Sequence, residues 1–318
     1  MQYVVYGAGA VGGVIGARLH LAGRTTTLLA RGEHLERIRA GGLVLDTAEG
    51  RLVAAAPATD TAAEVAWTPD TVVLLAVKSH QTQAALDDLG AHAPPGTPVV
   101  CTQNGVANEP TVLRRFQHTL GLCVMLPSTH LEPGLVVQKC DPTPGILDLG
   151  RYPRGSDPLS EAVASDLRAA GFQSEPRADI MAWKRRKLLV NVAGDVRALC
   201  GRGPAADELA RRSVEEGETV LGAAGLPVVS GAADDERRGD LLRLRPDLPP
   251  AGNSLAQSLA RGLATEVDFR AGEVLLLGRL HGVPTPANKL VVDLVHDLTR
   301  TGRAPGEVDA AALLAELP

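Results

Sequence analysis

The chain has 318 residues, a length that predicts two compact domains at roughly 150 residues each and excludes a small disulfide-stapled scaffold. Apolar residues make up 45% of the chain and charged residues 22%, which indicates a folded, soluble protein and excludes wholesale disorder. Its formal net charge is -5, and it has neither a run of about 18 apolar residues nor a signal-peptide pattern, so we expect no nucleic-acid partner, no membrane association and a cytoplasmic location.

The first half of the chain alternates short apolar runs with helical patterns. Strands are predicted at residues 2–6, 25–29, 71–77 and 98–102, and a helix of small and apolar residues is predicted at 12–21. Apolar strands separated by helices are typical of a parallel sheet that is covered on both faces. We therefore expect an α/β protein whose N-terminal domain is a Rossmann-type, doubly wound sheet.

The first predicted strand runs into the sequence GAGAVGG, which has the G-x-G-x-x-G spacing of a dinucleotide-binding turn. One glycine permits the tight turn, one lets the backbone approach a pyrophosphate, and one lets the helix pack closely on the strand. The flanking strand and helix favour this interpretation over a glycine-rich turn in a chain rich in Ala and Gly. The predicted cofactor-binding residues of this turn are Gly7, Ala8, Gly9, Ala10, Val11 and Gly12.

Arg31 follows the second predicted strand, at the position where an NAD-selective site usually has an acidic residue. A guanidinium there can pair with a 2′-phosphate, so we predict NADP(H) rather than NAD(H) as the cofactor. In the alternative interpretation, Arg31 is a solvated loop charge and Glu33 binds the ribose.

Two polar residues follow the next strands, at the carboxyl edge of the sheet where ligands bind in this fold. Lys78 comes directly after the strand at 71–77, and Asn104 follows the strand at 98–102. The chain has 27 arginines and only five lysines, which favours a task for Lys78 that arginine cannot perform. The alternatives are a surface lysine at a strand end and, for Asn104 with Gly105, an ordinary Asn-Gly turn.

Strand signals fade in the second half, which predicts an all-helical C-terminal domain. Three apolar runs between residues 120 and 149 are interpreted as strands that close one edge of the sheet. The expected domains are 1–176 and 177–318. Residues 228–253 are expected to form an exposed connection of mixed helix and loop, and the tail from residue 301 to form a short, weakly attached helix or to fray.

The four cysteines show neither paired nor zinc-ligand spacing. They are Cys101, Cys123, Cys140 and Cys200. We expect reduced structural thiols and no metal site.

The segment from residue 181 to 199 is predicted to be a buried helix, because apolar residues surround most of it. Lys187, Asn191 and Asp195 fall at i, i+4 and i+8, so they form one polar stripe along this helix. Such a stripe must face a cleft or pair internally, because an unpaired buried amine is costly. Lys187 is therefore a candidate general acid, and the alternatives are a structural ion pair with Asp195 or a glutamate, or an amine that reaches solvent.

Ser254 and Glu266 are the remaining candidate site residues. Ser254 with Gln257 also fits a helix capping box, which would explain the serine without a substrate. Glu266 lies two residues before Asp268, and periodicity does not decide which of the two acids faces water.

Taken together, these segments resemble the ketopantoate reductase (2-dehydropantoate 2-reductase) family over nearly the full length. The resemblance lies in GAGAVGG with Arg31, VKSHQT with Lys78, TQNG with Asn104, KLLVN with Lys187 and Asn191, and Ser254 followed by TEVD with Glu266. It implies an NADPH-binding Rossmann domain, a helical second domain and an active site in the cleft between them.

The resemblance also implies the roles of these residues. The expected catalytic residues are Lys187, Asn104 and Glu266, the expected substrate-binding residues are Lys78, Asn191, Asp195, Ser254 and Glu266, and Lys78 and Asn104 are also expected at the cofactor. Lys187 would be the general acid, Asn104 and Asn191 the positioning amides, and Ser254 with Glu266 the ketopantoate-binding pair.

The chain departs from the family pattern in three places. Asp195 stands where the family usually has a second Asn, and the connection before Ser254 is rich in Pro and charge. Phe269 is followed by Arg270 and Ala271 rather than by a small polar pair. A carboxylate at position 195 should disfavour a substrate carboxylate nearby, and the alternative is that it pairs with Lys187.

The sequence thus predicts NADPH-dependent reduction of ketopantoate to pantoate, in pantothenate biosynthesis. One alternative is the reduction of a different 2-oxo acid or ketone, and another is a non-catalytic NADPH-binding protein with the same fold. The expected partner is the small 2-oxo acid substrate, and the oligomeric state is left open, with a homodimer as one option.

Overall fold

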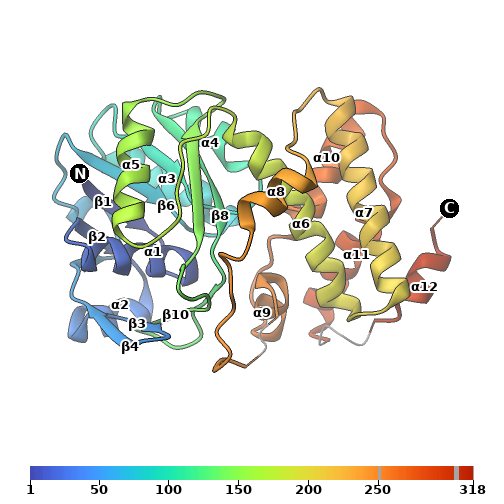
Figure 1. Ribbon diagram of the computed structural model, residues 1–318, viewed down its shortest axis with the longest axis horizontal. Helices are drawn as coiled ribbons and strands as arrows, with labels where there is room; N and C mark the ends of the chain where they lie inside the picture. The colour runs from blue at the N-terminus through green and yellow to red at the C-terminus, as the bar shows by residue number, and fades with distance from the viewer. Residues whose placement is uncertain (250–251, 304–307, 318) are drawn as a thin grey trace. The chain divides into compact units, whose positions relative to one another are not determined.

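A computed structural model of the chain describes residues 1–249, 252–303 and 308–317, and contacts within the chain group them into two compact units (Figure 1). Unit 1 comprises residues 1–104, 108–184 and 231–248, and unit 2 comprises 105–107, 185–230 and the described residues after 248. The proposed domain boundary between residues 176 and 177 stays a prediction.

Unit 1 is built around a seven-stranded sheet, which gives the α/β class that the sequence predicted. In spatial order its strands are β11 (Ile146–Arg151), β8 (Thr119–Met125), β7 (Val99–Cys101), β6 (Thr71–Leu75), β1 (Gln2–Tyr6), β2 (Thr25–Leu29) and β5 (Ala58–Thr59). Neighbouring strands are parallel except β11 and β8, which are antiparallel. Because β2 and β6 flank β1 on opposite sides, the strand order reverses at β1.

Helices cover both faces of this sheet, so the sheet is doubly wound (Figure 1). Before residue 170, the helices of unit 1 are α1 (Ala10–Leu21), α2 (Gly32–Gly41), α3 (Thr82–His92), α4 (Asn108–Leu113) and α5 (Pro158–Ala169), with short 3-10 turns η1 (Ala62–Glu64) and η2 (Ser79–Gln81). Alternate strand residues point to opposite faces. Tyr3 and Val5 of β1 pack in one core with residues of α1 and α5, whereas Val4 and Tyr6 pack in a second core with residues of α3.

A second, four-stranded sheet corrects one expectation. Of the three apolar runs between residues 120 and 149, the first and last form β8 and β11 at the edge of the main sheet, as predicted. The middle run forms β10 (Leu135–Gln138), which pairs with β3 (Leu43–Thr47) and β9 (Ser128–Thr129), while β4 (Gly50–Ala54) completes this sheet. Val136 of β10 packs in the same core as α1, so this run turns toward the helix layer instead of extending the main sheet.

The connection at 228–253 was expected to be exposed, and much of it instead packs on unit 1. It contains α8 (Gly231–Arg238). Arg237 binds the buried Asp148 of β11 with both Nε (2.9 Å) and Nη2 (2.6 Å). Arg245, which is 7% exposed, pairs with Asp46 of β3 at 2.8 Å. Arg237 and Arg245 therefore pair with carboxylates of unit 1, whereas Asp240 and Arg243 of the same connection pair with each other in exposed positions.

Unit 2 is all-helical, as predicted. Its elements are residues 185–200 of α6 (Ile180–Cys200), α7 (Pro204–Ala223), α9 (Ser254–Ala260), the 3-10 turn η3 (Val267–Phe269), α10 (Ala271–His281), α11 (Pro286–Thr301) and α12 (Ala310–Ala315). Val196, Leu209, Val267, Leu275 and Val291 belong to its apolar core. The expected tail helix is α12, and no helix of the described residues is long and apolar enough to cross a membrane.

Candidate functional site

A cavity of about 290 Å³ in unit 1 lies at the carboxyl ends of three neighbouring strands. Its walls come from the residues that follow β1, β2 and β6, where the strand order reverses. The lining residues are Tyr6, Gly7, Ala8, Gly9, Leu29, Ala30, Arg31, His34, Asp60, Val77, Gln81, Ala85 and His130. In open α/β sheets this reversal point is where ligands bind.

The glycines of the GAGAVGG turn have the separate tasks that the motif requires. Gly7 has φ +108°, and a Cβ there would lie 2.9 Å from the backbone nitrogen of Val77. A Cβ on Gly12 would lie 2.1 Å from the oxygen of Gly7, so only glycine lets α1 pack this closely on the turn. A Cβ on Gly9 would meet no atom within 4 Å, which leaves its backbone open toward the cavity.

Residues Gly9 to Val11 form the start of α1. Gly9 is the N-cap residue of the helix and Ala10 its first residue. No acidic side chain lies in the first turn, so nothing there opposes the binding of an anion at the helix N-terminus. The turn therefore fits the pyrophosphate of a dinucleotide.

Arg31 is exposed at the mouth of this cavity, at the N-cap position of α2. Glu33, the alternative ribose ligand, forms an i,i+4 ion pair with Arg37 at 3.2 Å. Below Arg31, the hydroxyl of Tyr6 donates to Oδ2 of Asp88 at 2.7 Å. Burial and the Asp88 carboxylate raise the pKa of Tyr6, and the nearby positive charge of Arg31 opposes this rise.

His34 is a cavity residue that the sequence reasoning did not identify. Its Nδ1 accepts from the N–H of Gly134 (2.8 Å), so its Nε2 carries the hydrogen and donates to the oxygen of Ala8 (2.8 Å). The ring lies 4.1 Å from that of His130. Burial lowers the pKa of His34. A neutral imidazole thus ties the glycine-rich turn to the turn before β10, and a lone histidine in a helical pattern gave no signal of this role.

Lys78 and Asn104 follow the neighbouring parallel strands β6 and β7, and both are half-buried. Nε2 of Gln103 donates to the oxygen of Val77 at 2.9 Å, so a hydrogen bond joins the residues that immediately precede Asn104 and Lys78. Gly105 has φ +80°, which agrees with the Asn-Gly turn proposed as the simpler interpretation. The turn and a role for Asn104 at the ligand are compatible.

A buried ion pair supports the Asn104 loop and was not predicted. Nζ of Lys184 lies 2.7 Å from Oε1 of Glu109 and donates to the backbone oxygens of Gln103 (2.8 Å) and Leu122 (3.1 Å). The side chain of Lys184 is 2% exposed and that of Glu109 is fully buried. The ammonium thus has two backbone acceptors and the Glu109 carboxylate as its counter-ion.

In unit 2, the predicted polar stripe lies on α6. Lys187 and Asn191 are half-buried, and Asp195 is completely buried. Arg270 supplies a cation to Asp195, with 3.1 Å between Nη1 and Oδ1. Nδ2 of Asn253 donates to the same carboxylate oxygen at 2.8 Å. Lys187 is the cation that the sequence suggests for Asp195, and the contact with Arg270 was not predicted.

The structure corrects the capping box proposed for Ser254. Asn253, not Ser254, caps α9, because its side chain accepts from the backbone N–H of Ala256 at 3.0 Å. Ser254 is the first residue of the helix. Of the two acids that periodicity could not distinguish, Glu266 is buried, whereas Asp268 is exposed and pairs with His296 at 2.9 Å.

The candidate residues thus fall into two groups, one in each unit. The glycine-rich turn, Arg31, Lys78 and Asn104 lie in unit 1, and Lys187, Asn191, Asp195, Ser254 and Glu266 lie in unit 2. Their assignment to cofactor and substrate stays a prediction.

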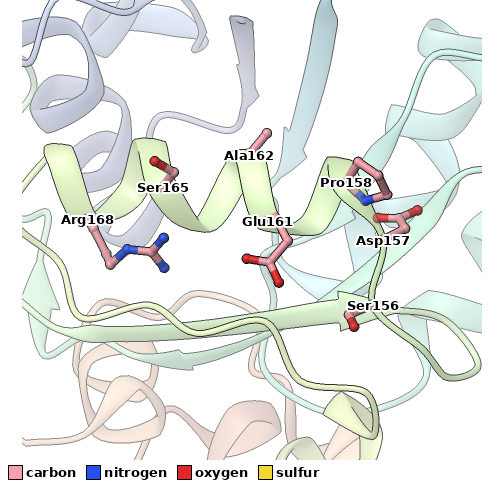
Figure 2. A pocket seen from close by; sticks show the side chains of 7 residues that line it. All are labelled: Ser156, Asp157, Pro158, Glu161, Ala162, Ser165 and Arg168. Atoms are coloured by element: carbon pink, nitrogen blue, oxygen red, sulfur yellow. The ribbon is translucent and has the colours of Figure 1, made fainter.

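A second hollow follows the outer side of α5 (Figure 2). Asp157 and Pro158 lie at the helix start, and Glu161 and Arg168 lie further along the same helix. Asp157 is occupied as the helix cap and pairs with Arg151, so the hollow is a shallow polar surface rather than a reaction site. Among the residues that the structure describes, no group of three His, Cys, Asp or Glu side chains could hold a metal ion.

Comparison with protein families matches both parts of the chain. Residues 3–154 match the family described as ketopantoate reductase PanE/ApbA. Residues 179–299 match the family described as ketopantoate reductase PanE/ApbA C terminal.

Individual relatives agree in length with this chain. A 2-dehydropantoate 2-reductase of Mesorhizobium japonicum is 31% identical, with 94% of this chain and 98% of the relative covered. The crystal structure of a PanE/ApbA family ketopantoate reductase from Ralstonia eutropha JMP134 is 27% identical, covers 95% of this chain and 99% of its own, and has a TM-score of 0.82. A D-mandelate dehydrogenase solved with NADH and anilino(oxo)acetate has a similar fold, at a TM-score of 0.83 and 22% identity over 95% of this chain and 99% of its own.

Proposed function

The chain belongs to the ketopantoate reductase family, and on that premise we propose that it reduces ketopantoate to pantoate with NADPH. The family consists of nicotinamide-dependent oxidoreductases, and its relatives imply a small 2-oxo acid as the substrate. The observation that carries the proposal is the fit of the cavity in unit 1 to a dinucleotide, in a chain that matches the family models in both units. A cytoplasmic location and a homodimer stay predictions from the sequence.

The cofactor site proposed here is the cavity at the ends of β1, β2 and β6. The open backbone at Gly9 and the helix N-terminus at Ala10 would hold the pyrophosphate. Arg31 would bind the 2′-phosphate and so select NADP(H), and the ion pair between Glu33 and Arg37 supports this choice over ribose binding by Glu33. Lys78 and Asn104 would lie at the nicotinamide end.

When bound, NADPH supplies the hydride that adds to the C2 carbonyl carbon of the substrate. The ammonium of Lys187 donates a proton to the carbonyl oxygen, so that the C=O group becomes CH–OH. Asn104 and Asn191 hold the carbonyl in the geometry for attack.

Substrate binding is assigned to Ser254 and Glu266. The Ser254 hydroxyl would bind the carboxylate, and the buried Glu266 would accept from the distal 4-hydroxyl of ketopantoate. Lys78 would contribute a positive charge near the substrate.

The test is NADPH consumption by the full chain with ketopantoate. We expect turnover that falls at least about 100-fold in Lys187→Ala, because the general acid is lost. Lys289→Ala is the matched control, since Lys289 is an exposed lysine of unit 2 that pairs with Asp293, and its activity should stay at the wild-type level. Wild-type turnover that survives in Lys187→Ala would disprove the assigned acid.

A second candidate function is the reduction of a different 2-oxo acid. The buried pair of Asp195 and Arg270 favours this candidate, because it replaces the residues that the family usually has at both positions. A panel of 2-oxo acids, including pyruvate and benzoylformate, would distinguish the two. NADPH binding without turnover on any member would instead favour the non-catalytic alternative.

A further inference from the structure

Two of the departures from the family pattern, Asp195 and Arg270, are in contact with each other. Asp195 lies on α6, and Arg270 lies between η3 and α10. Their charged groups meet at 3.1 Å, and the two residues are 0% and 3% exposed. The unusual negative charge at position 195 is therefore compensated by the unusual positive charge at position 270.

Asp195 is the counter-ion of the buried Arg270. Its Nε has no hydrogen-bond partner in the described part of the chain, and its Nη1 has only one further contact, with Oγ of Ser254 at 3.4 Å. A desolvated guanidinium without a counter-ion is strongly unfavourable. Asp195 therefore determines where the Arg270 head group lies.

The same carboxylate also holds the start of α9. Oδ1 of Asp195 accepts from Nδ2 of Asn253, and Oδ1 of Asn253 in turn caps α9 by accepting from the N–H of Ala256. Ser254 is the next residue. Asp195 thus fixes the backbone of Ser254 through Asn253 and contacts its hydroxyl through Arg270.

The direction of the hydrogen bond between Arg270 and Ser254 is fixed by chemistry. A guanidinium can only donate, so Oγ of Ser254 is the acceptor in this bond. The single hydroxyl proton of Ser254 is then left for another acceptor. Because the proton points away from the donor Arg270, the Ser254 hydroxyl is oriented to donate to an acceptor oxygen such as that of a carboxylate.

We propose that Asp195 and Arg270 are positioning residues that orient Ser254 as a hydrogen-bond donor to the carboxylate of a 2-oxo acid. The proposal rests on the proposed function, because it needs a substrate bound by Ser254. Asp195 itself does not contact the substrate in this scheme, which replaces its predicted role as a substrate ligand. The pair couples α6, which carries Lys187, to the serine that binds the substrate.

A charge-neutral double variant tests this role while avoiding an unpaired buried charge. Asp195→Asn with Arg270→Met keeps the amide contact available to Asn253 and removes the donor to Ser254. We expect a melting temperature near that of the wild type, an unchanged KM for NADPH, and a KM for the 2-oxo acid raised about tenfold, with a smaller change in kcat.

Two comparisons separate positioning from a merely structural role. In a Ser254→Ala background, the double variant should raise the KM for the 2-oxo acid no further, because Arg270 acts through Ser254. The matched control is Asp207→Asn with Arg197→Met, which removes an exposed Asp–Arg pair involving α6, and its KM should equal that of the wild type. Independent, multiplying effects of the Ser254 change and the double change would overturn the proposal, as would an unchanged KM in the double variant.

The positioning role can still be tested if the proposed function is wrong. If the wild type reduces no 2-oxo acid, equilibrium binding of pantoate and oxamate to the NADP-loaded protein replaces the kinetic measurement. Carboxylate binding that weakens about tenfold in the double variant, and no further in the Ser254→Ala background, supports the positioning role. The absence of carboxylate binding, or binding that the double variant does not weaken, refutes it.

Discussion

Lys184 is one of five lysines in an arginine-rich chain, and its ammonium is enclosed by Glu109 and two backbone oxygens. Lys184→Met leaves the Glu109 carboxylate buried without its counter-ion. We expect the free energy of unfolding to fall by about 3–5 kcal/mol in urea denaturation. Lys289→Met, which removes an exposed ion pair, should cost less than about 1 kcal/mol.

A double variant distinguishes the loss of the counter-ion from the loss of packing. Lys184→Met combined with Glu109→Leu replaces the pair by apolar groups and should recover much of the lost stability. Equal destabilisation in the single and double variants would mean that the shape of Lys184, and not the charge, supports the loop.

Arg31 carries the expected selection of NADP(H). Arg31→Ala should raise the KM for NADPH about tenfold or more and leave the KM for NADH nearly unchanged, because only NADPH has the 2′-phosphate. Arg39→Ala, at an exposed arginine of α2 that pairs with Glu64, is the control. The ratio of the two kcat/KM values measures the preference, and an unchanged ratio in Arg31→Ala would show that another residue makes the selection.

His34 gives the fold a pH dependence of defined sign. Burial lowers its pKa below 6.5 in the folded state, so the unfolded chain binds more protons in the range between the two values. The contribution of His34 to the free energy of unfolding should therefore be fully present above about pH 6.5 and should decrease as the pH falls below this value. Urea unfolding measured across this range should show a smaller slope in His34→Gln, whereas His281→Gln, an exposed position, should keep the wild-type slope.

At the scale of elements, different glycines of the glycine-rich turn are expected to serve the stability of the fold and the binding of NADPH. A Cβ added at Gly9 would meet no atom within 4 Å, and Gly9 has a φ of -72°, so Gly9→Ala should leave the melting temperature unchanged. The added methyl group would occupy the space proposed for the pyrophosphate, so the KM for NADPH should rise. Gly12→Ala places a Cβ 2.1 Å from a backbone oxygen and should destabilise the fold by more than about 1 kcal/mol. Thermal unfolding and NADPH titration of both variants check this. Similar losses of stability in the two would contradict it.

Some strands of the structure could be predicted from the sequence and others could not. The strands β1, β6 and β8 were predictable because they are buried along their whole length and read as continuous apolar runs. β4 was not predicted, although Leu52, Val53 and Ala54 are apolar, and four of its five residues are exposed. β10 was assigned to the wrong sheet because an apolar run does not specify its partner.

The candidate site was predictable to the extent that it depends on local motifs. The glycine-rich turn and the stripe on α6 follow from spacing alone. The partners of Asp195 could not be inferred, because Arg270 and Asn253 lie far along the chain and meet it only in the folded unit. The capping role of Asn253 was assigned to its neighbour Ser254, because Asn and Ser are both favoured as N-caps and the helix start was placed one residue late.

At the scale of the whole molecule, residues 231–248 return to unit 1 after a helical stretch of unit 2. Asp148 anchors this return by accepting from Arg237 and Arg177. Asp148→Asn removes the charge that both arginines pair with, so we expect limited trypsin digestion to cleave faster at Arg237 and Arg238. Asp240→Asn, at an exposed position of the same segment, is the control and should be cleaved at the wild-type rate.

Because unit 1 is made of segments that are separate in the sequence, it can be completed only late in the synthesis of the chain. A ribosome that has released only residues 1–184 has delivered the whole seven-stranded sheet but not Arg237 or Arg245. Until residue 248 has emerged, Asp148 of the seven-stranded sheet and Asp46 of the four-stranded sheet lack these arginine partners. The last step in completing unit 1 therefore waits for translation to pass through α7, a helix of the other unit.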